Sequence, residues 1–154
     1  MEVVSGSCRF GLWYVHVWWN DTAVHRVRFS TTGLEGEIPP LIRKYCGGQM
    51  VDCSALDCCA LHEETVYSRI YRAVRKVAYG ETKTYGEIAE ETGTSPRVVG
   101  QAMARNPAPL VIPCHRIVAA QGIGGFSPDV EIKRALLAMD TKGMRKVLLG
   151  KKPT

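Results

Sequence analysis

A cysteine and a histidine stand side by side in one short apolar run, where their side chains could do chemistry together. The run over residues 107–118 reads Pro-Ala-Pro-Leu-Val-Ile-Pro-Cys-His-Arg-Ile-Val, so His115 directly follows Cys114. A cysteine is nucleophilic only as the thiolate, so it needs a partner that removes or stabilises its proton. Adjacent side chains in an extended segment point to opposite sides, so His115 would act through a water molecule or after a turn at Cys114. The pattern indicates either a reactive thiol or a small buried residue.

The remaining cysteines indicate structure rather than catalysis. Three of them read as small buried residues, namely Cys8, Cys46 and Cys53. The first residues lack the basic and apolar segments of a secretion signal, so we expect the cytosol, where structural disulfides are disfavoured. Four candidate zinc ligands lie close together in the sequence, namely Cys53, Cys58, Cys59 and His62. They could hold a structural zinc ion, although their spacing fits no standard zinc pattern. If present, this zinc ion would support the N-terminal part of the chain and would take no part in the chemistry.

Helical periodicity precedes the Cys-His run. Apolar residues recur at helical spacing over residues 66–77, and a second, shorter helix is expected over residues 85–91. Ser95 offers an N-cap oxygen and Pro96 a preorganised first turn for a third helix, which ends at Arg105. The second and third helices have the outline of a helix-turn-helix.

The first part of the chain predicts a β-hairpin. Residues 10–19 are rich in aromatic and β-branched types and predict a strand, followed by a turn. Residues 22–29 alternate between an apolar side, which includes His25, and a wetter side with Arg26 and Arg28.

Two further helices complete the predicted elements. A short helix over residues 38–45 has prolines near its start and glycines at its end. A final helix over residues 130–139 follows a glycine-rich loop, whereas residues 50–62 show no clear period.

The charge is distributed unevenly between the two halves. Residues 1–62 carry five Lys and Arg against six Asp and Glu, and residues 63–154 carry fifteen against nine. A basic half beside a neutral one indicates a polyanionic partner such as DNA or RNA, or an inert basic surface. No apolar run approaches the length of a membrane span, so we expect no membrane partner.

Several separated motifs resemble those of one protein family. Residues 106–118 resemble the active-site signature of the O6-alkylguanine-DNA alkyltransferases, also called methylated-DNA–protein-cysteine methyltransferases. The runs Gly-Glu-Thr-Lys-Thr-Tyr-Gly-Glu-Ile-Ala (80–89) and Ser-Pro-Arg-Val-Val-Gly-Gln-Ala-Met (95–103) match upstream. Gly-Ile-Gly-Gly-Phe-Ser (122–127) and Lys-Arg-Ala-Leu-Leu (133–137) match downstream. The likeness is close over residues 63–140, whereas the first 62 residues resemble the family only in outline.

The resemblance implies an α+β fold in two parts. Residues 1–62 would form a small α/β domain with an antiparallel sheet, and residues 63–154 a helical, winged-helix-like domain with a helix-turn-helix. The implied reaction is direct, irreversible transfer of an alkyl group from guanine O6 in double-stranded DNA to the cysteine. No cofactor is used, each molecule acts once, and we expect a monomer. The family reads its helix into the minor groove and turns the damaged nucleotide out of the stack.

The matching positions imply a role for each site residue. Cys114 would be the nucleophile, His115 its base through a bound water, and Asp140 the group that orients the histidine. Tyr85 would help turn the nucleotide and donate a hydrogen bond to guanine N3, and Arg97 would fill the gap left in the stack. Further DNA-facing residues would be Gly100, Ala102 and Arg105. The substrate pocket would include Ser127, the carbonyls of Cys114 and Ile117, Phe126, and Asn106 bracing the turn.

Two positions depart from the family pattern. Asp140 stands where the family usually has the longer Glu, and Phe126 where it often has Tyr.

Two other functions stay open. One alternative is a non-catalytic relative that binds alkylated DNA, although such relatives lack the reactive cysteine. The other is a helix-turn-helix regulator in which Cys114 is simply buried.

Overall fold

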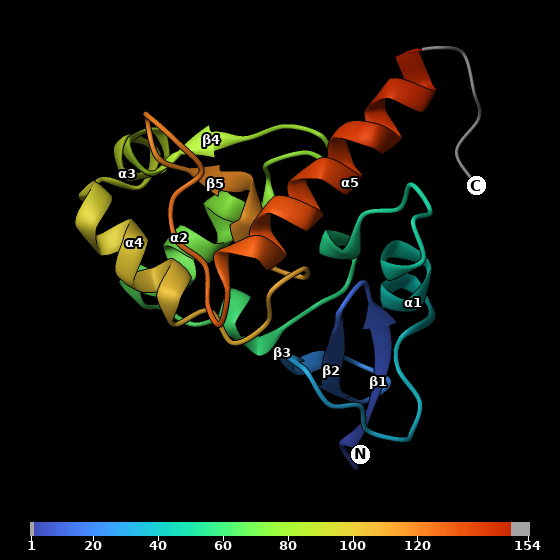
Figure 1. Cartoon of the computed structure of the whole chain (residues 1–154). Coiled ribbons are helices and arrows are strands. Elements are labelled where there is room, and N and C mark those ends of the chain that lie inside the picture. The colour runs from blue at the N-terminus through green and yellow to red at the C-terminus, as the bar shows by residue number, and fades with distance from the viewer. Residues whose placement is uncertain (1, 149–154) are drawn as a thin grey trace.

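A three-stranded antiparallel sheet and one short helix form the N-terminal part of the chain (Figure 1). The computed structural model describes residues 2–148. The strands pair in the order β1-β2-β3 and the helix packs beside β1. Their bounds are β1 Val4–Phe10, β2 Trp13–Trp19, β3 Val24–Ser30 and α1 Pro40–Cys46.

The turn between β1 and β2 corrects the predicted strand over residues 10–19. The chain reverses at Gly11, whose φ of 59° is readily adopted by glycine, and Phe10 pairs with Trp13 across the hairpin. Small polar residues dominate β1, so this strand carries little of the β-branched pattern on which a sequence-based assignment rests.

The two faces of the sheet differ in chemistry. Val17 and Val27 pair on the buried face. An irregularity beside Trp18 and Trp19 shifts the register, so His25 is exposed and its predicted place on the apolar side is wrong. The prediction for Arg26 and Arg28 is confirmed, because both are exposed.

Residues 50–62 cross from the sheet to the helices through two short 3-10 turns, Cys53–Ala55 and Cys59–Leu61. Within residues 2–148, no three His, Cys, Asp or Glu side chains are grouped to hold a metal ion. The Cys53 thiol donates to the Leu41 carbonyl at 3.8 Å, and His62 lies 2.6 Å from Asp57. The structure therefore does not bring the four candidate zinc ligands together.

The C-terminal part is helical, with the expected helix pair at its outer edge (Figure 1). The Ser95 side chain caps the last helix of that pair, and Gly93, with φ of 66°, ends the helix before it. The described part of the chain contains no helix both long and apolar enough to cross a membrane. The helices are α2 Val66–Arg75, α3 Tyr85–Thr92, α4 Pro96–Ala104 and α5 Val130–Leu148.

Two short strands connect the helix pair to the Cys-His run. Strand β4 (Lys83–Thr84) pairs in parallel with β5 (Ile117–Val118), so the start of α3 lies beside the end of the run. Helix α5 extends past the predicted residue 139. One apolar core includes residues of both halves, so the division at residue 62 stays a prediction. Of the predicted second part, residues 149–154 lie outside the described chain.

Candidate active site

Cys114 begins a 3-10 turn, Cys114–Arg116, that follows Pro113. His115 is expected to act on the thiol either through a water molecule or after a turn at Cys114, and the structure has the turn. Cys114 is 6% exposed and lines a cleft. Burial raises the pKa of the thiol, while a hydrogen bond with Asn106 and the charge of Lys133 oppose that rise.

Asn106 holds the turn that leads into this run. Its side-chain amide donates to the Ile112 carbonyl at 2.9 Å and accepts from the Ala108 backbone at 2.9 Å. These two hydrogen bonds lie at the turn where the bracing role is predicted. The contact of Asn106 with the thiol was not part of that prediction.

His115, the residue after Cys114 in the chain, forms a buried pair with Asp140. His115 Nε2 lies 3.0 Å from Asp140 Oδ2, and both side chains are almost fully buried. A carboxylate only accepts hydrogen bonds, so Nε2 carries the hydrogen. Burial lowers the pKa of His115, so the ring is neutral near pH 7 and Nδ1 is a free acceptor. Nδ1 is buried and has no hydrogen-bond partner among residues 2–148.

Two residues that the sequence did not indicate complete the surroundings of Asp140. The Tyr45 hydroxyl, from α1, donates to Asp140 Oδ1 at 2.6 Å and lies 3.3 Å from His115 Nε2. Arg116 is 1% exposed and donates from Nε to Asp140 Oδ2 at 3.3 Å. Its Nη1 bonds both carboxylate oxygens of Asp52 at 3.2 Å. Burial favours the neutral acid, but the hydrogen bonds from His115 and Tyr45 and the charge of Arg116 hold the pKa of Asp140 below its usual value.

Lys133 is a fully buried cation close to the same site. Its ammonium group donates to the Ile117 carbonyl at 2.5 Å and the Gly125 carbonyl at 3.2 Å, and lies 3.5 Å from the Tyr85 hydroxyl. Burial lowers its pKa to about 8. Lys133 lies in one of the motifs that resemble the family, but the sequence analysis assigns it no role. Its place on the inner face of the last helix could have indicated that it belongs to the site.

Tyr85 and the glycine-rich loop form the other side of the cleft. Tyr85 begins α3 and is half-buried. A Cβ at Gly124 would lie 2.7 Å from the Tyr85 hydroxyl, so the loop approaches the tyrosine only because glycine stands there. Phe126 meets Phe29 of β3 edge-on, with ring centroids 5.7 Å apart. Ser127 lies exposed at the rim of the cleft.

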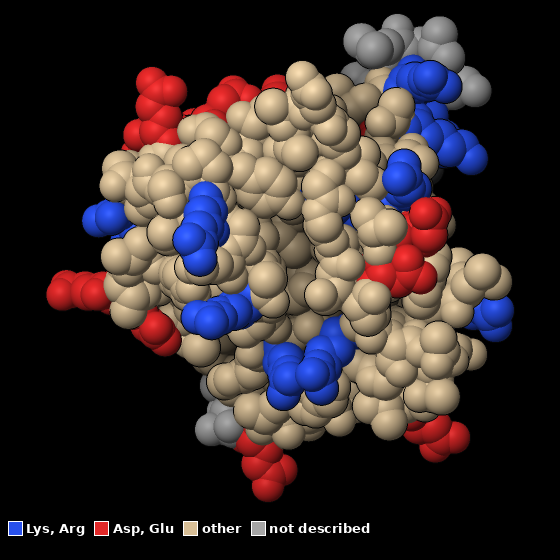
Figure 2. Space-filling view, turned by 60° about the vertical axis from the view of Figure 1, so that its left-hand side comes forward, with Lys and Arg blue, Asp and Glu red and all other residues tan. Residues whose placement is uncertain are grey.

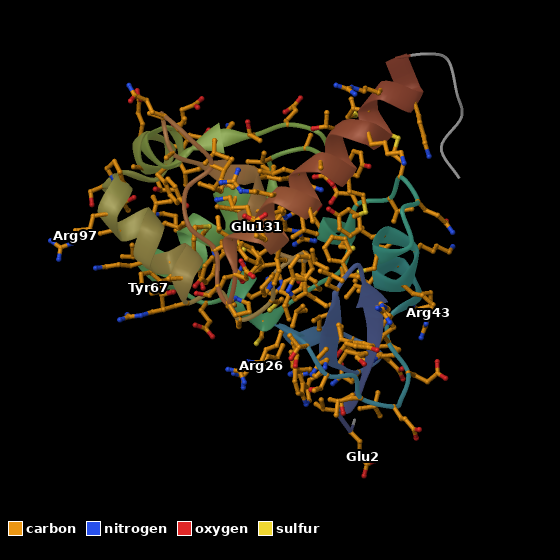
Figure 3. The ribbon with its side chains drawn as sticks, in the orientation of Figure 1. Glu2, Arg26, Arg43, Tyr67, Arg97 and Glu131 are labelled. Carbon is orange, nitrogen blue, oxygen red and sulfur yellow. The ribbon has the colours of Figure 1, made fainter. Side chains whose placement is uncertain are left out.

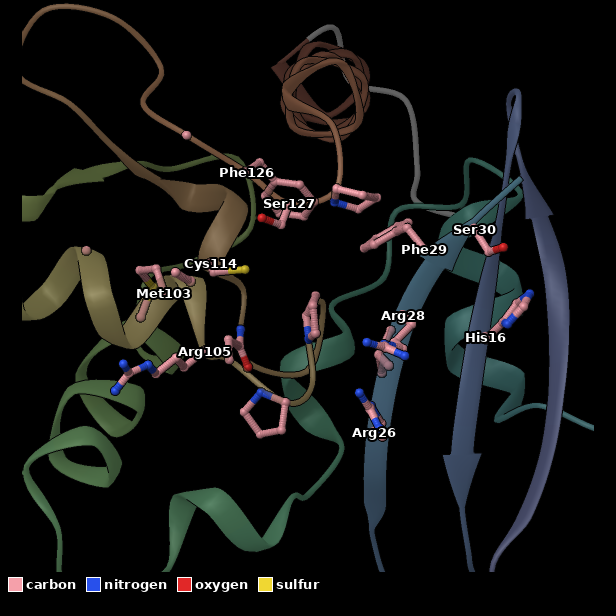
Figure 4. A pocket seen from close by; sticks show the side chains of 18 of the residues that line it. His16, Arg26, Arg28, Phe29, Ser30, Met103, Arg105, Cys114, Phe126 and Ser127 are labelled. Carbon is pink, nitrogen blue, oxygen red and sulfur yellow. The ribbon is translucent and has the colours of Figure 1, made fainter. Parts of the chain in front are cut away.

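The cleft opens between α4 and the sheet and has a volume of about 1220 Å³ (Figure 4). Gly100 of α4 and Arg105, directly after its end, line it, and Arg105 also donates to the Tyr67 hydroxyl at 3.2 Å. Arg97 points outward from the start of the helix (Figure 3). Ala102 is a correction: it is fully buried, with its carbonyl bonded to Tyr71, so it faces the core and not the DNA side.

A sequence comparison identifies the family from more than half of the chain. The family described as 6-O-methylguanine DNA methyltransferase, DNA binding domain, matches residues 65–142. This chain belongs to that family. The methylated-DNA–protein-cysteine methyltransferase of Metallosphaera sedula is 52% identical over 80 residues, which cover 52% of this chain and 51% of that protein. The chain thus spans about half the length of the curated relatives it matches.

Solved structures share the methyltransferase fold over nearly the whole described chain. The O6-methylguanine methyltransferase of Mycobacterium tuberculosis is 24% identical, with a TM-score of 0.71 over 91% of this chain and 93% of that one. The same enzyme in complex with DNA gives a TM-score of 0.74 at 23% identity, covering 90% and 93%. The enzyme from Pyrococcus kodakaraensis gives 0.66 at 25% identity, covering 90% and 98%. The N-terminal sheet therefore belongs to the family fold.

The buried lysine of this methyltransferase-family chain should act on the thiol through its charge. We expect Lys133→Met to raise the pKa of Cys114, because a nearby cation no longer stabilises the thiolate. Iodoacetamide should then modify Cys114 roughly tenfold more slowly at pH 7, measured by peptide mass. The exposed Arg134→Met is the matched control. An unchanged rate of modification in the Lys133 variant would show that the lysine does not act on the thiol through its charge.

Proposed function

We propose that this chain repairs DNA by moving the alkyl group of an O6-alkylguanine onto Cys114. The observation that carries the proposal is the position of the thiol. It lines a cleft together with residues of α4, and His115, which follows it in the chain, is paired with the buried Asp140. The names of the relatives and the solved DNA complex support the same conclusion, because they describe DNA-binding methyl acceptors.

The transfer requires that the thiol lose its proton as the alkyl group arrives. Burial raises the pKa of Cys114, so the resting thiol is protonated and poorly reactive. Nδ1 of His115 is the ring nitrogen left to accept that proton, through a water molecule, while Asp140 holds the ring by Nε2. The Sγ–carbon bond forms as the carbon–O6 bond breaks, and the bond electrons pass to guanine.

The departing guanine needs donors where negative charge appears. Tyr85 donates to guanine N3 and Ser127 toward O6, which stabilises charge that develops only during transfer. Lys133, beside the Tyr85 hydroxyl, strengthens that donor electrostatically. The Cys114 and Ile117 carbonyls accept from the guanine amino group. The Ile117 carbonyl already accepts from Lys133, which leaves its second lone pair for guanine.

Access to the cleft requires the nucleotide to leave the duplex. Helix α4 enters the minor groove, and exposed Arg97 fills the space that the rotated nucleotide leaves. The minor groove carries little sequence information, which suits a protein that acts on damage in any sequence. The product is a thioether. The Cys114 thiolate is a poor leaving group from it, so the alkyl group stays on the sulfur and each molecule acts once.

Mixing the protein with a duplex that carries one O6-methylguanine tests the proposal. We expect the Cys114 peptide to gain the mass of one methyl group, with methyl transferred equal to protein present at any excess of DNA. An unmodified duplex of the same sequence is the control. DNA binding without methyl transfer would instead identify a damage sensor or a regulator. Continued turnover beyond one methyl per protein would contradict the single-use mechanism.

A further inference from the structure

Two arginines of the N-terminal sheet lie exposed on strand β3, outside the helical half that carries the basic charge. Arg26 stands opposite Trp18 and Arg28 opposite His16 in the β2–β3 register, so the four side chains share one face of the sheet. The Arg26 guanidinium lies 5.9 Å from the centre of the Trp18 ring, which orients it.

This face forms one wall of the cleft that contains Cys114. Figure 4 shows Arg26 and Arg28 on the strand across the cleft from Arg105, with Cys114 on the same side of the cleft as Met103 and Arg105. Figure 2 shows Lys and Arg side chains on either side of a central hollow. The cleft volume of about 1220 Å³ exceeds the ~300–1,000 Å³ typical of pockets for small molecules. An opening of this size with cations on both walls suits a polyanion.

The charges of the two arginines are not neutralised by the protein. Within residues 2–148, neither Arg26 nor Arg28 lies within ion-pair distance of a carboxylate. Residues 1–62 carry six acidic side chains against five basic ones, so this part of the chain is not basic overall. Two neighbouring unpaired cations facing the cleft are therefore a local feature of β3, available to an external anion.

We propose that Arg26 and Arg28 bind backbone phosphates of the DNA, so that the sheet acts as a second DNA-binding wall opposite α4. The inference rests on the proposed function, because it takes duplex DNA as the partner. Guanidinium groups bind phosphate by charge-assisted hydrogen bonds that carry no sequence information. The wall would hold the duplex in position while the damaged nucleotide enters the cleft.

The salt dependence of DNA binding tests this assignment. Fluorescence anisotropy on unmodified and O6-methylguanine duplexes compares the wild-type protein with Arg26→Ala/Arg28→Ala. The slope of log K against log salt should become shallower by about 0.9 for each phosphate that the variant no longer binds. Binding at low salt should weaken roughly tenfold on both duplexes, since binding to phosphate is blind to the base.

Two matched variants separate a local contact from a general charge effect. Arg43→Ala/Lys44→Ala removes the same charge from exposed positions on α1 that do not line the cleft, and should keep the wild-type slope. Arg26→Lys/Arg28→Lys keeps the charge and should retain most of the slope. If the slope of log K against log salt is the same for the β3 alanine variant and the α1 alanine variant, the proposal of a second DNA-binding wall is wrong.

Methyl transfer by the wild-type protein is measured on the same duplex. If the wild type transfers methyl but the β3 slope is unchanged, the proposed function stands and this inference fails. If the slope changes but no methyl moves, the binding wall stands and the repair function fails. A wild type that binds neither duplex would overturn both.

Discussion

Replacing Cys114 with serine is expected to abolish methyl transfer while leaving DNA binding within about twofold of wild type. A hydroxyl has a far higher pKa than a thiol and is a weak nucleophile at neutral pH. Loss of a nucleophile lowers rates by about 10⁴-fold or more in other enzymes. Cys114 is 6% exposed, and serine is close to it in size, so the surrounding turn should keep its shape. Rapid-quench measurement of labelled methyl on protein would follow the reaction.

The exposed Cys59 provides the matched control for this experiment. Cys59→Ser removes an accessible thiol from the 3-10 turn Cys59–Leu61, outside the cleft lining, and should transfer methyl at the wild-type rate. The anisotropy of both variants on the damaged duplex separates binding from chemistry. Methyl on the protein of the Cys114 variant would show that another residue is the acceptor.

The position of the thiol could be predicted because its signals are local. Pro113, Asn106 and the Ser95-Pro96 start of α4 each fix the chain within a few residues, and the structure has a turn at Cys114 as one of the two expected routes. The pairing of His115 with Asp140, 25 positions away, came from the resemblance and not from spacing, and the structure brings the two together at 3.0 Å.

The rest of the site depends on contacts between distant parts of the chain. Tyr45 bonds Asp140 across 95 positions, and Asp52 bonds Arg116 across 64. Neither residue has an unusual neighbourhood, since Tyr45 reads as an ordinary apolar position of a short helix. The same holds for β1, whose small polar residues become a strand only because β2 pairs with them. Tertiary pairing decides these features, and a single sequence does not display it.

The hydrogen bonds of Tyr45 explain how the shorter Asp140 can stand where the family usually has Glu. One carboxylate accepts from the Tyr45 hydroxyl, the His115 ring and the Arg116 guanidinium. A side chain one methylene shorter than Glu reaches the histidine at 3.0 Å here, and Tyr45 occupies its other oxygen. Through Tyr45 of α1, the N-terminal part of the chain thereby helps to hold Asp140 and His115 in position.

We expect Asp140→Asn to slow methyl transfer by about 10²–10⁴-fold, the scale seen when the carboxylate that orients a catalytic histidine is lost. The amide can present hydrogens to His115 and Arg116, which favours the wrong histidine tautomer. Arg116 also loses one of its two ionic partners, so the free energy of unfolding should fall by about 3–5 kcal/mol. Single-turnover rates at saturating DNA and urea titration measure the two effects separately.

The ionisation of Asp140 also makes the stability of the protein depend on pH. The pKa of Asp140 is held below its ordinary value of 3.8, so its stabilising contribution is complete above that pH and is lost as the pH falls through the lower folded value. Asp140→Asn should therefore lose less stability than wild type on acidification below about pH 4, measured by urea titration at a series of pH values.

Two variants distinguish orientation of the base from simple support of the fold. Tyr45→Phe removes one donor and leaves the carboxylate charged, so transfer should slow by only about tenfold or less. Asp140→Glu restores the charge and should recover most of the rate, with a moderate loss of stability of about 1–3 kcal/mol from the extra methylene in a packed site. If Asp140→Asn loses stability yet transfers methyl at the wild-type rate, Asp140 supports the core alone and His115 needs no orienting group. A rate loss that Asp140→Glu rescues while stability stays low would place the aspartate in the proton relay.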